Sequence, residues 1–318
     1  MRWKAHGGDG SRVGDILDKA GVDRRAVTEG RVFIGRKRVR SDDESVNEGD
    51  VVEIARAVEA HGKIAILVQA DDFVAVSKPA GIPTIADHAG ASHALVALVA
   101  RDLGVRPDSL HPTSRLDRDV SGVVVLARTQ AAAQRLLQAR AAGKYERRYA
   151  ALAIRAPVPA AGTWEAPIGR ARDPRLREPY GRDAIPALTA FATCACIRGG
   201  AAMLAVSPRT GRTHQIRVHS AHAGSPLLGD SAYGGPIRVT MPSGRVLAPG
   251  RVALHAVRVV VPDAAGRPVA VEAPIPVELL ALWSELGGEP SAWERCAACV
   301  FDPPSSSSPP SAHSRSLP

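Results

Sequence analysis

The stretch from Ser114 to Ala127 reads SRLDRDVSGVVVLA and joins a charged segment to a wholly apolar run. The run VVVLA is typical of a strand that is buried on both faces, so it predicts a place inside a sheet. The D-x-x-S-G pattern before it makes an ordinary turn, and spacing alone favours that interpretation. A second interpretation concerns Asp117, a carboxylate at the mouth of a buried strand between Arg115 and Arg118. It would be kept ionised and partly desolvated, as a catalytic carboxylate requires.

Further apolar runs of strand length lie on both sides of this stretch: IAILV, FVAV, YAALAI, LTAFATCACI, MLAV and VALHAVRVVV. Helices are fewer, and the clearest are HALVALVARDL and TQAAAQRLLQARAAG, the second of which is expected to end at Gly143. Several strands with scattered helices predict an α+β fold around a mixed or antiparallel sheet, in a domain that spans residues 64–288.

Residues 11–57 are expected to form a small α+β domain of their own. A helical pattern surrounds Val13, Ile16 and Leu17, and the strand-like segments RVFIGRKRVR and VVEI follow it. Residues 24–40 are strongly basic, whereas the acidic residues of this region follow in residues 42–50. This separation predicts a surface that faces RNA phosphates, with Arg24, Arg25, Arg36 and Arg38 as binding residues. A solvated charged face with internal ion pairs is the alternative.

Three other segments are expected to lie outside packed domains. Residues 58–63 (VEAHGK) are interpreted as a linker, and the segment from Gly234 to Gly250 as an exposed loop rich in Gly and Pro. Residues 303–318 contain mostly Ser and Pro and cannot bury a core, so we expect a disordered tail.

The composition indicates a soluble protein that attracts polyanions. The 318 residues carry a formal charge of +9 and have a pI near 9.9, which favours nucleic acid as a partner. The four cysteines include one C-A-A-C pair with no second pair and no histidine nearby, so a zinc site is not expected. The chain has no run of 18 apolar residues and no apolar N-terminal signal. We therefore expect a cytoplasmic protein in a reducing compartment, with no membrane partner.

Two more segments place polar side chains beside apolar runs. Residues 147–152 (RRYAAL) begin a strand with a tyrosine, and Tyr149 could stack on a base or transfer a proton, although a strand tyrosine is more often a packing residue. Residues 210–219 (TGRTHQIRVH) concentrate hydrogen-bonding groups that are costly to bury unless they are paired or contact a ligand. Metal binding by the histidines here is not favoured, because no carboxylate pattern accompanies them.

Together the three segments resemble the RluA-type family of pseudouridine synthases, whose signatures are H-R-L-D-x-x-T-S-G, K-x-Y-x-A and G-R-T-H-Q-I-R-V-H. The resemblance extends to SKPAG at residues 77–81, to LGD and YG at residues 228–234, and to LHA and APIP near the end. It covers about residues 64–286. Residues 11–57 resemble the small S-four RNA-binding domain, which often precedes this catalytic domain.

The resemblance implies a role for individual residues. It makes Asp117 the catalytic aspartate, Tyr149 the active-site tyrosine beneath the target base, and Arg217 the ion-pair partner of Asp117. Arg115 would help to take the place of the flipped nucleotide. It also implies that Arg212, His214 and Gln215 contact the substrate.

The implied activity is the isomerisation of uridine to pseudouridine in a structured RNA, more in keeping with ribosomal than with transfer RNA. No atoms are gained or lost in this reaction, so no cofactor and no metal are expected, and a monomer is the default. Two departures from the signatures lie beside the aspartate: the family histidine is Ser114 here, and the family threonine is Val120. The family lysine of K-x-Y is Arg147, which keeps the charge.

Two alternatives remain open on the sequence alone. The departures at Ser114 and Val120 allow a catalytically inactive RNA-binding or assembly protein that kept the fold. A glycoside hydrolase that uses Asp117 and Asp119 as its two carboxylates is the weaker alternative.

Overall fold

The computed structural model describes residues 2–28, 32–35, 37–54, 62–86, 93–198 and 200–301. The chain divides into two compact units: Met1–Arg147 with Leu254–Ile275, and Arg148–Ala253 with Pro276–Pro318. Among the described residues, no helix has both the length and the apolar character needed to cross a membrane. The predicted linker at residues 58–63 lies mostly outside the described residues, and the predicted tail at 303–318 lies wholly outside them.

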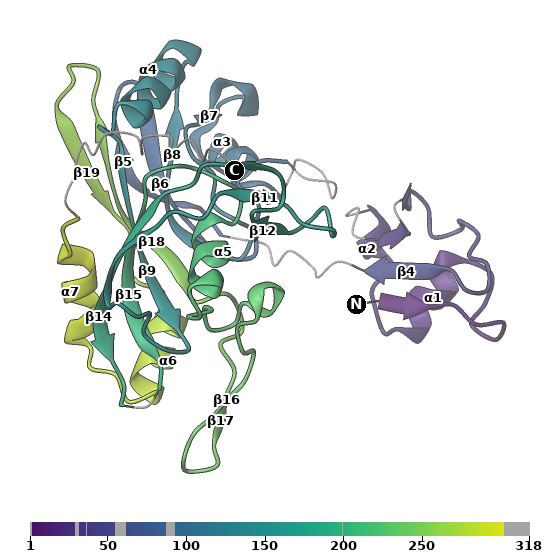
Figure 1. Cartoon of the computed structure of the whole chain (residues 1–318). Coiled ribbons are helices and arrows are strands. Elements are labelled where there is room, and N and C mark those ends of the chain that lie inside the picture. Colours follow the sequence, from purple (N-terminus) through teal and green to yellow (C-terminus); the bar gives the residue numbers. More distant parts are fainter. Residues whose placement is uncertain are drawn as a thin grey trace, which may run out of the picture. The chain divides into compact units, whose positions relative to one another are not determined.

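The N-terminal part of the first unit has a sheet and a core of its own (Figure 1). Its strands follow the order β1 (Arg2–Lys4), β4 (Val51–Ile54), β2 (Val32–Ile34) and β3 (Lys37–Arg38), and all neighbours are antiparallel. Helix α1 (Val13–Lys19) buries Val13, Ile16 and Leu17, as the helical pattern predicted, and α2 (Arg25–Thr28) adds Ala26 and Val27. The small α+β architecture is therefore present, while its assignment as an S-four-like domain stays a prediction.

The rest of the first unit is built on a mixed sheet. Strand β8 (Ser121–Ala127) is buried at every residue, as its apolar sequence predicted. It pairs with β6 (Phe73–Lys78) in antiparallel and with β18 (Leu254–Pro262) in parallel orientation. The remaining strands are antiparallel to their neighbours: β5 (Ala65–Gln69) on β6, β7 (His111–Pro112) on β8, and β19 (Pro268–Glu272) on β18.

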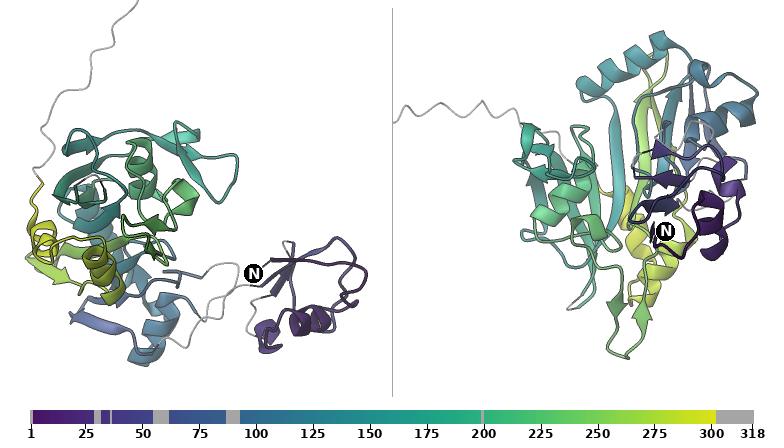
Figure 2. Two further views of the ribbon diagram at one scale, coloured as in Figure 1. Left: turned by 90° about the horizontal axis from the view of Figure 1, so that it is seen from below. Right: turned by 90° about the vertical axis from the view of Figure 1, so that its right-hand side faces the viewer.

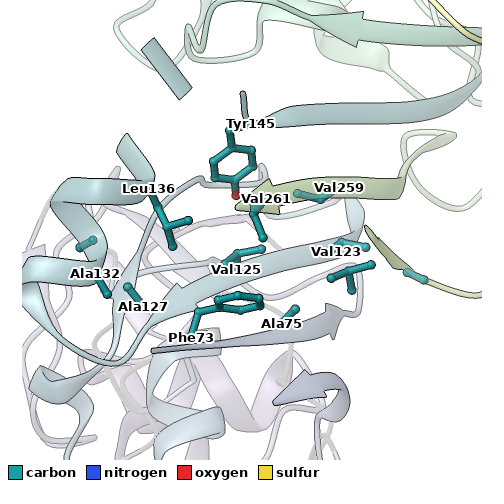
Figure 3. Close-up of a cluster of buried hydrophobic side chains, with 13 residues drawn as sticks. Phe73, Ala75, Val123, Val125, Ala127, Ala132, Leu136, Tyr145, Val259 and Val261 are labelled. Atoms are coloured by element: carbon teal, nitrogen blue, oxygen red, sulfur yellow. The ribbon is translucent and has the colours of Figure 1, made fainter. Parts of the chain in front are cut away.

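Both helices that the sequence predicted in this part are present. Helix α3 spans Leu95–Leu103 and is followed by the single-turn helix η1 (Pro107–Ser109). Helix α4 spans Gln130–Ala141; the Thr129 side chain accepts a hydrogen bond from the Ala132 backbone N–H at its start, and Gly143 follows it with φ +73°. Helix α4 contributes Leu136 to a core that includes Phe73, Val125, Tyr145 and Val261 (Figure 3).

The second unit contains four antiparallel strands in the order β10 (Ala161–Trp164), β14 (Thr189–Cys196), β15 (Ala202–Pro208) and β9 (Glu146–Ala153), which begins at the boundary between the units (Figure 1). A small sheet is made by β11 (Ile168–Arg170), β12 (Arg177–Pro179) and β13 (Arg182–Ile185). The helices are α5 (Gln215–His222), α6 (Val277–Glu285), α7 (Ser291–Ala298) and the single turn η2 (Ser231–Tyr233).

The segment predicted as an exposed loop between Gly234 and Gly250 is a hairpin. Its strands are β16 (Val239–Thr240) and β17 (Val246–Leu247), and the hairpin projects beyond the rest of its unit in two views (Figures 1 and 2). Most of its side chains are exposed, as expected, although Leu247 is buried.

Candidate active site

The segment that carries Asp117 is a turn that leads into β8. The Val120 backbone N–H donates to the Asp117 carbonyl oxygen at 3.1 Å, which closes the turn. Asp117 is half-buried at the start of the sheet, whereas Arg115 and Asp119 are exposed. The two interpretations of the pattern are therefore compatible, because a turn of this kind presents a carboxylate at the mouth of a buried strand.

A fully buried lysine ties this turn to the loop after β6. Lys78 is 0% exposed, and its ammonium group donates to the carbonyl oxygens of Pro79 at 2.9 Å, Ile82 at 2.7 Å and Arg118 at 3.0 Å. The Gly81 backbone N–H adds a bond to the Arg118 carbonyl oxygen at 2.8 Å. A buried ammonium that binds carbonyl groups fixes their positions, because each lost bond would leave a desolvated charge underpaired.

A threonine holds the residue just before the aspartate. The Thr84 hydroxyl donates to the Leu116 carbonyl oxygen and accepts from the Leu116 backbone N–H, both at 3.0 Å. Thr84 and Leu116 are both buried, so water does not compete for these bonds. The backbone on either side of Asp117 is thus fixed by hydrogen bonds while its carboxylate stays partly accessible.

The S-G end of the turn motif is held by the distant L-H-A motif. In the parallel ladder, Ser121 pairs with His255 and Gly122 with Ala256, and the Ser121 hydroxyl lies 2.7 Å from His255 Nδ1. Gly122 has φ +117°, and a Cβ atom placed there would lie 2.2 Å from the Ala256 carbonyl oxygen. Only glycine fits so close an approach, which gives the motif glycine a physical reason.

The two departures from the family signature are packed into the interior. Ser114 is buried, and its hydroxyl lies 3.4 Å from the Tyr145 hydroxyl, which also bonds Thr113 Oγ1 at 3.0 Å. Val120 is 2% exposed and has no polar group to satisfy. Both substitutions therefore replace larger or polar side chains with ones that the surrounding core accommodates.

In the second unit, Tyr149 and Arg217 lie on different elements. Tyr149 is a buried residue of β9 opposite Val206 of β15. Arg217, on α5, makes a two-pronged salt bridge with Asp230: both nitrogen–oxygen distances are 2.7 Å, and the side chains are 10% and 1% exposed. The Arg217 guanidinium also stacks over the Tyr233 ring at 4.9 Å. These contacts fix the guanidinium, and the predicted pairing of Arg217 with Asp117 stays a prediction.

The residues at the start of α5 differ in how many hydrogen bonds they make with the rest of the chain. His214 has φ +58°, and its Nδ1 lies 2.6 Å from the Tyr233 hydroxyl. The Gln215 amide donates to the Leu188 carbonyl and Thr189 hydroxyl oxygens, and it accepts from the Thr210 hydroxyl and the Arg212 N–H, all within 2.9 Å. All four hydrogen-bonding positions of that amide are thereby occupied, which favours a positioning role for Gln215 over direct contact with a substrate.

His219 is a structural residue of the same helix. Its Nδ1 lies 2.8 Å from the Thr189 hydroxyl and its Nε2 2.8 Å from the Ala166 carbonyl oxygen, so these partners require Nε2 to carry the proton. Burial lowers the pKa of His219, which keeps the ring neutral. Within the described ranges, no group of three or more histidine, cysteine or acidic residues could hold a metal ion.

The basic segment of the N-terminal part is partly neutralised. Arg24 donates to both Asp18 and Asp42 at distances of 2.6 to 3.1 Å, so its charge is shared with two carboxylates. Lys37 pairs with Glu44 at 3.0 Å. Basic and acidic residues that are separated along the sequence are therefore neighbours in space at these pairs.

The structure describes the other three predicted RNA-binding arginines of this part to different extents. Arg25 is exposed. Arg36 lies outside the described residues, and of Arg38 only the backbone, in β3, is described. A depression of about 450 Å³ is lined by Val27, Thr28, Lys37, Val39 and Arg40.

Sequence reasoning assigned no role to Lys78, Thr84, Asp230 or Tyr233. Lys78 and Asp230 lie within the SKPAG and LGD motifs, so an ionisable residue inside a motif was the signal that could have identified them. The contact partners were not visible, because Lys78 binds the Arg118 carbonyl 40 residues away and Thr84 binds Leu116 32 residues away.

The first unit offers a carboxylate on a fixed backbone, and the second offers a guanidinium that is held by Asp230 and the Tyr233 ring. Comparison with known proteins shows which family of proteins combines such groups with a mixed α+β fold. The family described as RNA pseudouridylate synthase matches residues 72–222.

Individual relatives extend the match over most of the chain. A ribosomal large subunit pseudouridine synthase D of Xanthomonas campestris pv. campestris is 33% identical over 281 residues, which covers 82% of each chain. An uncharacterised RNA pseudouridine synthase of Bacillus subtilis is 32% identical over 71% of this chain and 74% of its own. The structure of human RNA pseudouridylate synthase domain containing 4 has a TM-score of 0.55 at 22% identity, covering 70% of this chain and 93% of that one, and shows the likeness of fold.

The chain therefore belongs to the RNA pseudouridine synthase family, and it is an enzyme that isomerises uridine to pseudouridine in RNA. The RluA-type resemblance of the sequence and the expected α+β fold are both confirmed.

Proposed function

We propose that this enzyme modifies a uridine of large-subunit ribosomal RNA and that Asp117 is its catalytic carboxylate. The observation that carries the second part is the way the chain holds the Asp117 turn. Lys78 and Thr84 fix the backbone at Arg118 and Leu116, on both sides of a carboxylate that remains partly accessible. Such fixed geometry around an accessible reactive group is what positional catalysis requires.

The reaction needs a carboxylate but no redox step. The bond between the ribose and the uracil ring nitrogen breaks, the ring turns, and carbon five of the ring joins the ribose. Asp117 acts on the ribose or the ring as nucleophile or base, and the proton on carbon five is removed with the help of Tyr149. Arg217, with its charge fixed by Asp230, is assigned to hold the carboxylate ionised.

Recognition of the RNA is supported by charge and by the names of relatives. A uridine in a folded RNA must be flipped out, which costs a few kcal/mol that phosphate contacts and stacking offset. The net charge of +9 supplies the phosphate attraction, and Arg115, Arg212 and His214 are the assigned contacts near the base. Relatives from Xanthomonas, Yersinia and Pseudomonas are named for the ribosomal large subunit. A ribosomal substrate also agrees with a monomeric enzyme of the cytoplasm.

Release of tritium from RNA labelled at carbon five of uridine tests the substrate, because each isomerisation frees that hydrogen. Fragments of large-subunit ribosomal RNA should release tritium with the wild-type enzyme, and a pool of transfer RNA should not. Release from transfer RNA alone would contradict the ribosomal assignment. Binding of ribosomal RNA without release from any RNA would favour the inactive RNA-binding alternative. A map of pseudouridine in cellular RNA with and without the gene then identifies the position.

A further inference from the structure

The small sheet of β11, β12 and β13 is made by a chain that crosses over itself. Strands β12 and β13 pair with opposite edges of β11, and the two residues Tyr180 and Gly181 join them. The crossing is close, because a Cβ atom on Gly169 of β11 would lie 2.4 Å from backbone atoms of Gly181. Only glycine fits such an approach. The backbone around Tyr180 is therefore closely packed against β11.

Tyr180 presents its ring to solvent at this crossing. The side chain is 70% exposed, whereas its backbone N–H donates to the Pro167 carbonyl oxygen at 2.8 Å. Its φ of +57° lies in the left-handed region, which is unfavourable for a residue with a side chain. The ring makes an edge contact with His222, with 6.1 Å between the ring centroids. Strain at a mostly exposed aromatic residue does little for the core, so it indicates a function outside packing.

A bulge in β13 changes which residue lies opposite Arg170 of β11. Ile168 lies opposite Ile185, so a regular antiparallel register would bring Asp183 opposite Arg170. The register shifts instead: Arg182 takes that position, and Asp183 adopts a φ of +55°. Bulges redirect side chains in this way and are frequent beside functional sites. Here the bulge replaces an acid with a base.

The result is a row of three arginines across the small sheet. Arg170 lies opposite Arg177 of β12 and also opposite Arg182 of β13. Directly opposite residues share a face of the sheet, and like charges there are destabilising. Arg170 and Arg182 are exposed, and Arg182 lies 3.8 Å from Asp183. Within the described ranges, no hydrogen bond or ion pair holds the Arg170 guanidinium. The two exposed guanidinium groups thus favour an anionic partner.

A structural role accounts for one arginine of the row but not for the others. Arg177 is half-buried, and its Nη1 donates to the Pro174 and Leu176 carbonyl oxygens at 3.0 and 2.6 Å. Arg170 and Arg182 close no such turn. An acidic protein partner would match their charges alone. RNA matches the charges and the exposed ring together, because phosphates bind guanidinium groups and bases stack on aromatic side chains.

The small sheet is hydrogen-bonded to residues that are assigned to the substrate. Arg212 Nε donates to the Pro186 carbonyl oxygen at 2.9 Å, directly after β13. The Tyr233 hydroxyl lies 2.6 Å from His214 Nδ1 and accepts the Arg177 backbone N–H at 3.0 Å. Strand β12 also contacts α5 (Figure 1). An RNA that binds at Arg212 and His214 therefore brings its neighbouring nucleotides within reach of the small sheet.

We propose that Arg170, Arg182 and Tyr180 form a docking surface for the RNA that flanks the target uridine. Phosphates bind the two guanidinium groups, and a base stacks on the Tyr180 ring. The surface sets affinity and takes no part in the bonds that break and form. The inference rests on the RNA substrate of the proposed function, but it does not depend on the role of Asp117.

Salt-dependent binding of a large-subunit ribosomal RNA fragment to the full-length enzyme tests the two arginines. Arg170→Ala and Arg182→Ala should each lower the slope of log affinity against log salt by about one unit. Arg175→Ala is the matched control, because Arg175 is exposed in the same segment but is bound by Asp173 at 3.0 and 2.7 Å. It should change the slope less. Equal changes in all three variants, or an unchanged slope in the first two, would overturn the assignment.

Stacking is tested by two substitutions at Tyr180. Tyr180→Ala should weaken binding of the same fragment by roughly tenfold, while Tyr180→Phe keeps a ring and should bind almost as the wild type does. In the tritium-release assay the loss should appear in KM and not in kcat. Equal losses in both variants, or none in either, would contradict stacking. A fragment that wild-type enzyme binds without conversion would instead contradict the proposed function and leave this binding test intact.

Asp183→Asn tests the bulge in the opposite direction. Asparagine tolerates the left-handed conformation, so the bulge should remain, while Arg182 loses the carboxylate 3.8 Å away. Affinity for the same fragment should therefore rise by roughly two- to fivefold. Unchanged or weaker binding would show that Arg182 does not meet a phosphate.

Discussion

The Asp117 turn and the Arg217 cluster hold their charged groups in opposite ways. In the turn, a buried ammonium group and a hydroxyl bind backbone atoms on both sides of Asp117, whose carboxylate stays partly accessible. In the cluster, the Arg217 guanidinium is itself bound by a buried carboxylate and packed against an aromatic ring. The comparison teaches that a charged side chain can be positioned through its backbone and stay partly accessible, or be held directly by partners that bury it.

The largest expected effect comes from Asp117→Asn, which keeps the shape of the side chain but removes its charge and nucleophilicity. Turnover should fall by roughly a thousandfold or more, as when a positioned catalytic group is lost. Stability and RNA affinity should change little, since the turn is held by backbone contacts. Asp119→Asn is the control, because Asp119 shares the turn but is exposed. Equal activities of the two variants in the tritium-release assay would refute the role of Asp117.

Asp230→Asn tests the other half of the comparison, the buried salt bridge between Arg217 and Asp230. It removes the buried carboxylate that binds two nitrogen atoms of Arg217, so the free energy of unfolding should fall by about 3 kcal/mol. Asp108→Asn is matched to it, because Asp108 pairs with Arg106 at 2.6 Å but both side chains are largely exposed. That variant should lose less than about 1 kcal/mol. Urea denaturation of both variants measures the difference, and equal losses would mean that burial does not set the strength of the Arg217 pair.

Lys78→Met sharpens the contrast by removing a buried support that acts on the backbone. Three carbonyl oxygens lose a charged donor, but the variant no longer has to bury an ammonium group, which offsets part of that loss. We therefore expect the free energy of unfolding to fall by about 2 kcal/mol. Turnover should fall as well, since the backbone at Arg118 is released. Lys144→Met, at an exposed position, should change stability by less than about 0.5 kcal/mol. A Lys78→Met enzyme with full turnover would show that the lysine supports the fold alone.

The smallest effect is expected in the N-terminal part. Replacement of Arg24, Arg25, Arg36 and Arg38 together by alanine should weaken RNA binding and flatten its salt dependence. Of the single changes, Arg25→Ala should lower the slope of log affinity against log salt by about one unit. Arg24→Ala should lower it less, because its guanidinium is already shared by two aspartates. Binding titrations at several salt concentrations measure both slopes, and an unchanged slope in the quadruple variant would remove this surface from RNA recognition.

The fold was predictable where a pattern is local. The apolar runs identified β6, β8 and β18, and the periodic segment before Gly143 identified α4. The short strands β10 to β13 were missed: β10 and β13 are mostly exposed, and β11 and β12 have only three residues each, so none shows a clear alternation of apolar and polar residues. Helices α6 and α7 were also missed, since no clear helical spacing of apolar residues set either one apart from the neighbouring segments.

The candidate site was predictable as a set of motifs but not as a set of contacts. Asp117 was singled out because it precedes a buried strand, and its predicted catalytic role came from the family resemblance. The two bonds of Thr84 to Leu116, in contrast, depend on how distant loops meet. The Asp230 partner of Arg217 follows a turn after α5, and no sequence spacing distinguishes it from other acids.

The pairing of Ser121 with His255 has a consequence for the order in which the protein is made. These residues are 134 positions apart, and β8 gains its parallel neighbour only when β18 has left the ribosome. At about 5 to 20 residues per second, the nascent chain spends roughly 7 to 27 s with the start of its central strand, Ser121 and Gly122, lacking its parallel partner. An exposed apolar strand edge attracts other chains. Nascent chains stalled before Leu254 should therefore bind holdase chaperones, and release should follow once translation passes Pro262.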